Sequence, residues 1–556
     1  MKKLFKYITI VLVTGGLFQA CETTDLDLRV SPNDLASDQA DPNLLLNSIQ
    51  LAYASNQSSI SDIGAQVTRI DYMFGRNYFN NYSGATFNGI WERFYSSGTN
   101  IPGRPVDVGI LTNIQNLESI DAQTDVDYSF HIGVGKVLAA HVLFQLADYL
   151  GQAVWSEALQ PAEFPAPTLD DGPAIYAAAQ GLLNEGEALL ASGPATQGAT
   201  DMFYGGDTDK WIKLINTLRL RAAVLTGDTA TFNSIIAGGD FIAENDDDFQ
   251  FAYGTSELQP DDRHPDYAAD YTPSGANIYQ SNWLMETMLD KGDPRIRYYF
   301  YRQVDATPGA DAPANEEDLA CSLAVPPQHF QDGGYTYCSV PNGYWGRTHG
   351  NDEGTPPDNF KRVAVGVYPA GGRFDDSSFG NVGLGLGGGG AGIEPIILAS
   401  YVDFWRGIMA TSPAQKAAFM EAGLEKHIAK VQSFGSLDGN ADASVAPTET
   451  EVETYISDTV AAYLAASGDD QQNIFAEQYF ITLFGGATEA YNYYRLTGFP
   501  TTLVPNWEPD PGAFPRSFLY AQNEVITNPN IQQKTTLTEQ VFWDTNPASP
   551  TFPPAN

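Results

Sequence analysis

Two aromatic-rich segments carry the residue types that could hold a ligand. The first covers residues 72–87 and the second residues 335–349, and both mix rings with amide or guanidinium side chains. Rings stack on the apolar faces of sugars and peptides, while amide and guanidinium groups bond their hydroxyls and amides. We expect ligand contacts from Tyr78, Asn81, Tyr82 and Trp345, with Arg347 as a polar partner. Packing in a hydrophobic core is the alternative role for each ring.

The other chemistry-bearing residues form no recognisable catalytic or phosphate-binding motif. The six histidines make no HExxH, HxH or HxxH pair, and no GxSxG sequence is present. Gly133-Val134-Gly135-Lys136 lacks the spacing of a phosphate loop and lies inside an expected helix. A pair of glycosidase carboxylates has no local sequence signature. We therefore expect a protein that is not an enzyme and that uses no cofactor.

Two acidic runs, 246–248 and 261–262, raise the question of a cation site. Neither run matches an EF-hand loop, in which ligands alternate along twelve residues. A solvated acidic loop is the expected role. A structural Ca²⁺ is the alternative, and no motif supports it.

Hydrophobic periodicity and helix-stop residues predict a mainly helical chain. The expected helices cover 43–54, 62–74, 127–150, 173–190, 207–226, 281–291, 395–407, 413–434, 448–466 and 470–495, the last with a break at Gly485-Gly486. Consecutive helices suggest antiparallel pairs of the tetratricopeptide type, although no 34-residue period is visible.

The middle of the chain has a different composition. Residues 240–394 are rich in Gly, Pro, Asp and Tyr, and residues 383–392 contain seven glycines. We expect a loop-rich insertion with short strands within a single domain, 43–556. Its helical scaffold covers 43–239 and 395–496, and 497–556 form a C-terminal loop segment. Long loops on a helical scaffold are where binding residues concentrate.

The charge balance excludes one class of partner. The chain of 556 residues has a net charge of −39, from 68 acidic and 29 basic residues. Because the first twenty residues hold three lysines and no acid, the rest carries −42. Such a chain cannot neutralise phosphates, so we expect no nucleic-acid binding. Hydrophobic residues make up 43%, which is enough for a large core.

The N-terminus has the features of an export signal. Lys2 and Lys3 precede an apolar run, 7–18, that is too short to span a bilayer. The run leads to Ala20-Cys21, which resembles a bacterial lipobox. The resemblance implies a signal peptide over 1–20, lipidation of Cys21 and a tether over 21–42. An ordinary signal peptide with an incidental cysteine is the alternative.

The other two cysteines, Cys321 and Cys338, lie 17 residues apart in the loop-rich region. Their spacing is not that of a zinc site. A disulfide fits an oxidising compartment. Two free thiols are the alternative.

Several segments together resemble the SusD/RagB-like nutrient-binding outer-membrane lipoproteins, and most closely SusD-like group 2. Acidic residues after Cys21 resemble the surface-export signal of Bacteroidota lipoproteins. Further matches, in chain order, are 147–158, 211–221, Gly292-Asp293-Pro294-Arg295, 346–350 with 356–358, 489–500, and 514–530. One departure is Ala399-Ser400-Tyr401, where members often carry Ala-Glu, so any role of that Glu does not transfer.

The resemblance implies a fold and a role. The fold would be mainly α, with tetratricopeptide-like helix pairs in a right-handed scaffold and a loop-rich insertion. The protein would be a lipid-anchored surface lid on a SusC-like TonB-dependent transporter barrel, capturing an oligosaccharide or a peptide without covalent chemistry. A stand-alone glycan-binding lipoprotein that feeds a neighbouring hydrolase is the alternative. The matched motifs would be structural, because they lie at helix ends and turns.

Overall fold

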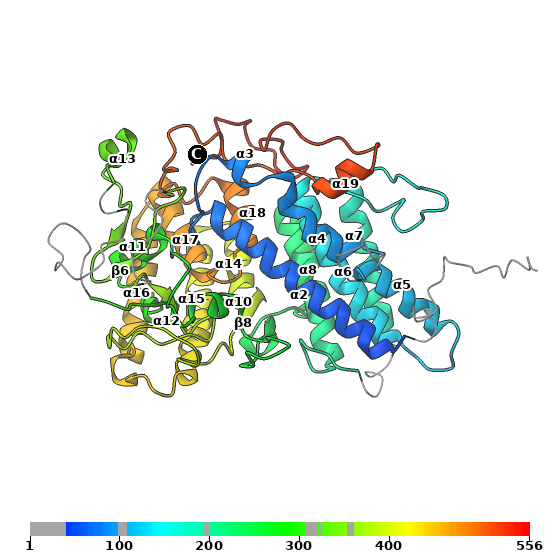
Figure 1. The fold of residues 1–556 in the computed structure, drawn as a ribbon, viewed down its shortest axis with the longest axis horizontal. Coiled ribbons are helices and arrows are strands. Elements are labelled where there is room, and N and C mark those ends of the chain that lie inside the picture. The colour runs from blue at the N-terminus through cyan, green and yellow to red at the C-terminus, as the bar shows by residue number, and fades with distance from the viewer. Residues whose placement is uncertain are drawn as a thin grey trace, which may run out of the picture. The chain divides into compact units, whose positions relative to one another are not determined.

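The protein was analysed as a computed structural model that describes residues 40–97, 108–192, 199–305, 321, 324–352 and 361–555. Cys21, the expected signal peptide and nearly all of the expected tether lie outside these residues. From Pro42 onward the chain forms one compact unit. It is mainly helical, as the sequence predicts (Figure 1).

The first helical group is built around a long N-terminal helix, α2 (Pro42–Val67). The sequence predicted two helices here. No proline interrupts residues 43–67, and the buried face continues through Ile60 and Ile63, so a single helix forms. The rest of the group comprises α3 (Tyr78–Asn81), the 3-10 helix η2 (Gly84–Phe87), α4 (Asn88–Tyr95), α5 (Ile110–Asp121), α6 (Ser129–Leu150), α7 (Gly172–Leu190), α8 (Thr208–Thr226) and α9 (Thr229–Gly238).

Helix α6 is the centre of this group. It packs on α7, α2 and α5 and ends at Gly151, whose φ of 82° favours glycine. Within the described residues it is the one helix long and apolar enough to cross a bilayer, and 94% of its apolar window is buried inside the protein. Such burial is typical of a core helix.

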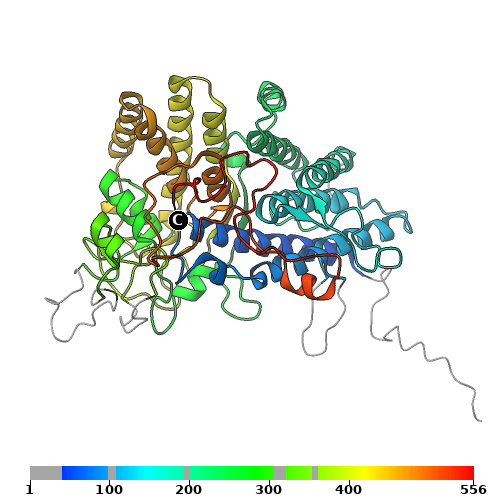
Figure 2. The same cartoon turned by 90° about the horizontal axis from the view of Figure 1, so that it is seen from above.

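The second helical group follows the insertion. It comprises α14 (Ala399–Met409), α15 (Pro413–Ser433), the 3-10 helices η5 (Phe434–Leu437) and η6 (Ala443–Val445), α16 (Glu449–Ala465), α17 (Gly468–Thr482) and α18 (Thr488–Thr497). The expected break at Gly485-Gly486 is confirmed as the turn between α17 and α18. Helix α18 packs on α2 and so joins the two groups (Figures 1 and 2).

The insertion is loop-rich, as expected, and begins and ends on one strand pair. Strand β3 (Phe249–Ala252) is antiparallel to β8 (Ile393–Ile397). The expected helix from Pro395 therefore starts four residues later, because Pro395 belongs to β8.

The remaining short elements of the chain lie mostly in this insertion. They are β1 (Gln152–Ala153) with β2 (Asp170–Asp171), β4 (Phe300–Tyr301) with β7 (Ala364–Val365), β5 (Ser339–Val340) with β6 (Tyr344–Trp345), η3 (Asn245–Asp247), α10 (Pro265–Asp270), α11 (Asn282–Lys291), α12 (Ile296–Tyr299), α13 (Gln328–Gly333) and α19 (Gln522–Thr527).

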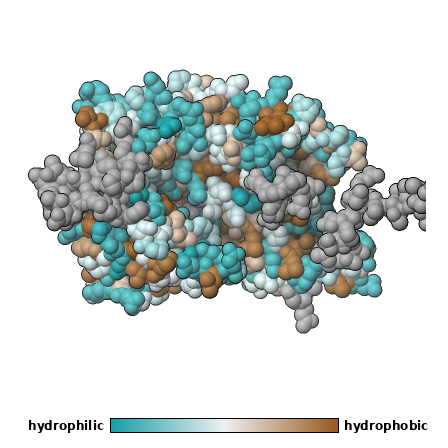
Figure 3. All heavy atoms as spheres, in the orientation of Figure 1, coloured by the Kyte–Doolittle hydropathy of each residue, from teal (hydrophilic) through white to brown (hydrophobic). Residues whose placement is uncertain are grey.

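The C-terminal segment has little regular structure but contributes to the core. The ring of Phe518 stacks on Tyr149 of α6 at 5.8 Å between centroids. On the face shown in Figure 3, apolar residues are scattered among polar ones, as is usual for a protein surface in water.

Candidate functional site

The motifs that carry the family resemblance converge on a buried ionic network. Arg221 of α8 donates to Asp148 of α6 at 2.8 Å and to Glu489 of α18 at 2.6 Å. Asp148 also accepts hydrogen bonds from Tyr176 at 2.6 Å and from the indole of Trp543 at 2.8 Å. All five side chains are buried. A charge network with this many internal partners holds helices together.

The Asp-Pro-Arg element has a similar role. Arg295 donates two hydrogen bonds to Asp293 and others to Thr482 and Gln478 of α17, and both members of the ion pair are fully buried. Tyr455 of α16 donates to the same aspartate at 2.7 Å. The expectation that the matched motifs are structural is thus confirmed for these residues.

The expected ligand residues of the first aromatic segment lie mostly inside the protein. Tyr78 is 1% exposed and hydrogen-bonds with His349 at 3.1 Å, and Tyr82 is 3% exposed and packs edge-on against Phe518. A ring without an exposed face cannot stack on a ligand in this conformation. Asn81 is half-buried, so its role as a contact stays a prediction.

The expected residues of the second segment are buried too. Trp345 packs in a small cluster with Tyr279 and the two cysteines, and the Arg347 guanidinium lies 4.5 Å from the centre of the Tyr279 ring. Physically, both residues support Tyr279 from the protein interior. The expectation that Trp345 and Arg347 contact a ligand directly is therefore at odds with this conformation.

Cys321 and Cys338 form a disulfide with a Cα–Cα distance of 5.4 Å. The pair is buried against Trp345. The crosslink thus fixes the loops behind Tyr279, next to the second aromatic segment.

The acidic runs have protein partners. Asp247 pairs with Lys213 at 2.7 Å, and Asp248 pairs with Lys430 at 2.6 Å and accepts from the Ala399 N–H. In the other run, Asp261 pairs with Arg263. Among the described residues, no group of three or more His, Cys, Asp or Glu side chains could hold a metal ion.

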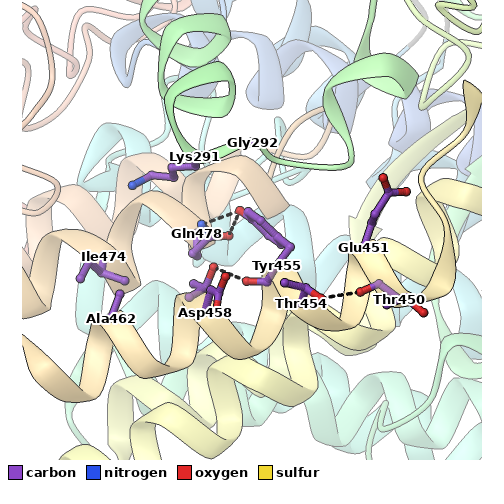
Figure 4. A pocket seen from close by; sticks show the side chains of 11 residues that line it. Lys291, Gly292, Thr450, Glu451, Thr454, Tyr455, Asp458, Ala462, Ile474 and Gln478 are labelled. Atoms are coloured by element: carbon purple, nitrogen blue, oxygen red, sulfur yellow. Dashed lines mark hydrogen bonds between the residues drawn. The ribbon is translucent and has the colours of Figure 1, made fainter.

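One large hollow lies between the end of α11 and helices α16 and α17 (Figure 4). Its volume is about 480 Å³, but four of its polar groups are engaged within the protein. Tyr455 and Gln478 hydrogen-bond each other, Thr454 donates to the Thr450 carbonyl, and Lys291 pairs with Glu477 at 2.6 Å. Size alone therefore does not make this hollow a binding site.

A smaller and more enclosed cavity of about 210 Å³ lies where the two helical groups meet the insertion, and we call it the carboxylate cavity. Its walls come from α2, the segment after α2, α10, the loop before α11, β8 and the α17–α18 turn. The polar lining residues are Ser58, Ser61, Asp62, Gln66, Asp71, Tyr72, His264, Asp266, Tyr279, Gln280 and Glu394.

Four carboxylates share this small space, and it raises the pKa values of three of them, Asp62, Asp71 and Glu394. Burial and the neighbouring Asp266 raise the pKa of Asp71 to about 7. Burial first, and then the charge of Asp266, raise the pKa of Asp62 well above its usual value. Burial also raises the pKa of Glu394, which is 4% exposed, and Asp62 adds to that effect. Perturbed acids in a concave site mark a candidate functional site.

The two predicted segments contribute to the carboxylate cavity through other side chains than the predicted ones. Tyr72 and Tyr279 line the cavity, whereas Tyr82 donates to Gln66 of its wall at 3.3 Å and Arg347 lies behind Tyr279. The carboxylates were missed because they lie far apart in the sequence. The exposed rings of the first segment are Phe74 and Phe79, at 52% and 48%.

The sequence model of the SusD-like group 2 family, described as starch-binding and associating with the outer membrane, matches residues 32–314. That is half of the chain, and the chain belongs to this family. No curated protein matches it at a significant level.

Solved structures of the same family share the fold. A SusD/RagB family protein from Bacteroides thetaiotaomicron superposes with a TM-score of 0.62 at 19% identity, covering 92% of this chain and 100% of that one. A SusD homolog from Bacteroides uniformis gives 0.62 at 15% identity with the same coverage. A chitin-binding protein gives 0.55 at 19% identity, covering 91% and 100%.

Proposed function

We propose that the protein is a substrate-binding lipoprotein of the bacterial surface, anchored in the outer membrane through Cys21. It captures an oligosaccharide or a peptide and acts as the lid of a SusC-like TonB-dependent transporter barrel. It performs no covalent chemistry and needs no cofactor. Membership of the SusD-like family supports the role, and the carboxylate cavity is where we place the ligand.

The observation that carries the placement is the state of the polar groups around this cavity. In the hollow of Figure 4, Tyr455, Gln478, Thr454 and Lys291 are all satisfied by neighbouring residues. In the carboxylate cavity, no hydrogen bond contributes to the pKa of Asp62 or Asp71 among the described residues. Asp71 is half-buried and Asp62 is exposed, so both carboxylates are accessible to a ligand that hydrogen-bonds with them.

The cavity is smaller than the 300–1,000 Å³ typical of a site that encloses a whole drug-sized ligand. It therefore accommodates one unit of an oligomer, with the rest of the chain outside. This size fits an oligosaccharide or a peptide better than a compact metabolite.

The anchor and the partner are tested together in membranes. Native protein solubilised in mild detergent is expected to co-purify with a barrel in stoichiometric amount, and Cys21→Ala is expected to release the protein from the membrane. Purification without any barrel would favour the alternative, a stand-alone glycan-binding lipoprotein that feeds a neighbouring hydrolase.

The ligand class is tested with arrays of oligosaccharides and peptides, probed with the soluble chain that starts after Cys21. Binding to one family of oligomers, without turnover, supports the proposal. Turnover of any array component would instead identify a surface hydrolase. Binding to neither array would contradict the proposed capture role.

A further inference from the structure

The carboxylate cavity contains acids without basic counterparts. Asp62, Asp71, Asp266 and Glu394 line it, and no lysine or arginine does so in the described part of the chain. The one basic side chain in the wall is His264, and burial lowers its pKa, so it is neutral at pH 7. Glu394 is buried, Asp71 and Asp266 are half-buried and Asp62 is exposed. An acid that is partly withdrawn from water is normally paired with a cation, because an isolated charge there is costly.

Two arginines lie against the Tyr279 ring, and one of them, Arg347, also hydrogen-bonds Tyr72 of the cavity wall. The guanidinium of Arg362 is 3.9 Å from the centre of the Tyr279 ring, and that of Arg347 is 4.5 Å from it. Neither arginine lines the cavity. The other titratable groups that face the acids are the hydroxyls of Tyr72, Tyr279 and Tyr253, the last of which hydrogen-bonds Glu394.

A second, independent feature indicates a ligand. Gln280 is 4% exposed and lines the cavity, and its side-chain amide has no hydrogen-bond partner among the described residues. A ligand that carries hydroxyl or amide groups beside a cation would satisfy Gln280 and the carboxylates together.

The arrangement suits an organic cation better than a metal ion. Calcium needs six to eight oxygens at 2.3–2.6 Å. No group of acids or histidines in the described residues converges closely enough to hold a metal. The acids come instead from separate walls, namely α2, the segment after it, α10 and β8. A group with several N–H donors can hydrogen-bond with carboxylates on several of these walls.

We propose that the carboxylate cavity receives a primary ammonium group of the nutrient, together with the sugar or peptide unit that bears it. The inference rests on the proposed capture function and narrows its substrate class. Two sources share this chemistry: an amino sugar that lacks its acetyl group, and the free amino terminus of a peptide.

Binding of such a cation is coupled to proton release. Below pH 7 Asp71 holds a proton, because burial and the charge of Asp266 raise its pKa to about 7. Burial and neighbouring carboxylates also raise the pKa of Asp62 and of Glu394. An arriving ammonium group favours their charged forms, so protons leave as it binds. Affinity therefore rises as the pH rises through about 7, and it falls again as the ligand's own amine loses its proton, at about pH 8 for a peptide amino terminus.

Calorimetric titration with matched probes tests the inference. The sugar pair is the tetramer of N-acetylglucosamine and the same tetramer with one acetyl group removed. The peptide pair is tetraalanine amide with and without an N-terminal acetyl group. Probes with a single amine, at 0.15 M salt, minimise general attraction to a protein of charge −39. Two buffers of different ionisation enthalpy report the proton release.

The cavity variants are Asp71→Asn and Glu394→Gln, with Asp62→Asn as a third choice if either lowers the unfolding midpoint. The matched control is Asp458→Asn, an exposed acid that lines the hollow of Figure 4. We expect one free amine to bind at least tenfold more tightly than its acetylated partner, because charge-assisted hydrogen bonds are the strong ones. The cavity variants should remove this preference and the control should keep it.

Four results would overturn the inference. The first is equal affinity for free and acetylated probes with both weakened by the cavity variants, which leaves the proposed capture function intact. The second is an amine preference that the cavity variants do not change. The third is the absence of binding by both amines. The fourth is Ca²⁺ alone binding the wild type and not Asp71→Asn. The array experiment tests the capture function separately, so the two failures are distinguishable.

Discussion

At the scale of single residues, the buried charges explain why the family motifs recur along this chain. Arg221 links Asp148 on α6 with Glu489 on α18, and α8, which carries it, packs against α6. Each of these charges depends on the others, since removal of one partner leaves a buried charge uncompensated. The network therefore determines how three helices fit together.

We predict that Arg221→Met lowers the free energy of unfolding by about 3–5 kcal/mol, because Asp148 and Glu489 lose their counter-ion in the interior. The matched control is Arg219→Met, two residues away on the same helix, whose partner Glu187 is 38% exposed. A surface pair contributes about 1 kcal/mol or less. Denaturant unfolding checks both, and equal effects of the two changes would contradict the role of the network.

The sequence predicted the structural role of these residues but could not separate core rings from ligand-facing ones. Tyr78 and Tyr82 have the same neighbours in the sequence as the exposed Phe79. They are buried because Phe514 and Phe518, more than 430 residues later, cover them. Burial by a distant segment leaves no local signal, and neither does the assembly of Asp62, Asp71 and Glu394.

At the scale of elements, α2 determines where the two helical groups meet. It packs on α4, α5 and α6 on one side and on α18 on the other. A Cβ at Gly64 would lie 2.6 Å from the Ala487 carbonyl oxygen and 2.8 Å from the Tyr149 hydroxyl. The glycine is thus needed for close approach of α2 to the start of α18.

We predict that Gly64→Ala destabilises the protein by about 1–3 kcal/mol, as overpacking of a core does. Gly181→Ala on α7 is the control, since nothing lies within 4 Å of its Cβ position. That change should be neutral or stabilise by up to about 1 kcal/mol, because alanine favours a helix. Thermal unfolding measures both, and a neutral Gly64→Ala would show that the two helical groups are less closely packed than described.

The disulfide stabilises the loops of the insertion. We predict that Cys338→Ser, with Cys321→Ser, lowers the free energy of unfolding of this region by about 2–4 kcal/mol, as expected for a loop of this length. Protease cleavage within the insertion should become faster, while the helical groups stay protected. Identical cleavage rates with and without the disulfide would show that it contributes nothing to this region.

Helices with a strong hydrophobic period were predicted well, because the residues that begin and end them are local signals in the sequence. Asp207 caps α8 and Gly227 ends it, and both signals are in the sequence. The start of α14 was placed too early, at Pro395, because β8 depends on pairing with β3 nearly 150 residues earlier. Pairing at that separation cannot be deduced from local pattern.

At the scale of the whole molecule, the free energy of unfolding should be highest at an intermediate pH, because buried acids and histidines have perturbed pKa values. Burial raises the pKa of Asp71 and of Asp270 to about 7, so the folded state holds protons that the unfolded state has lost. Stability from these groups therefore falls as the pH rises from about 4 to above 7. Burial lowers the pKa of His141, His349 and His427, so stability from them falls as the pH drops below about 6.5.

We predict that thermal stability is highest at an intermediate pH and decreases between pH 6.5 and pH 8, because Asp71 and Asp270 lose their protons in this range. Asp71→Asn should flatten the alkaline side, because the neutral amide does not titrate. A melting series from pH 5 to 9 measures this. Stability that rises steadily to pH 8 would contradict the raised pKa values of the buried carboxyls.

The central claim is that the protein captures its ligand in the carboxylate cavity. The most direct measurement is the calorimetric affinity of the best array ligand for the wild type and for Gln280→Ala combined with Asp71→Asn, with Asp458→Asn as the control. We predict at least a tenfold loss in the double variant, an unchanged control, and unfolding midpoints close to that of the wild type. Undiminished affinity in a folded double variant would contradict the claim and place the ligand elsewhere on the protein.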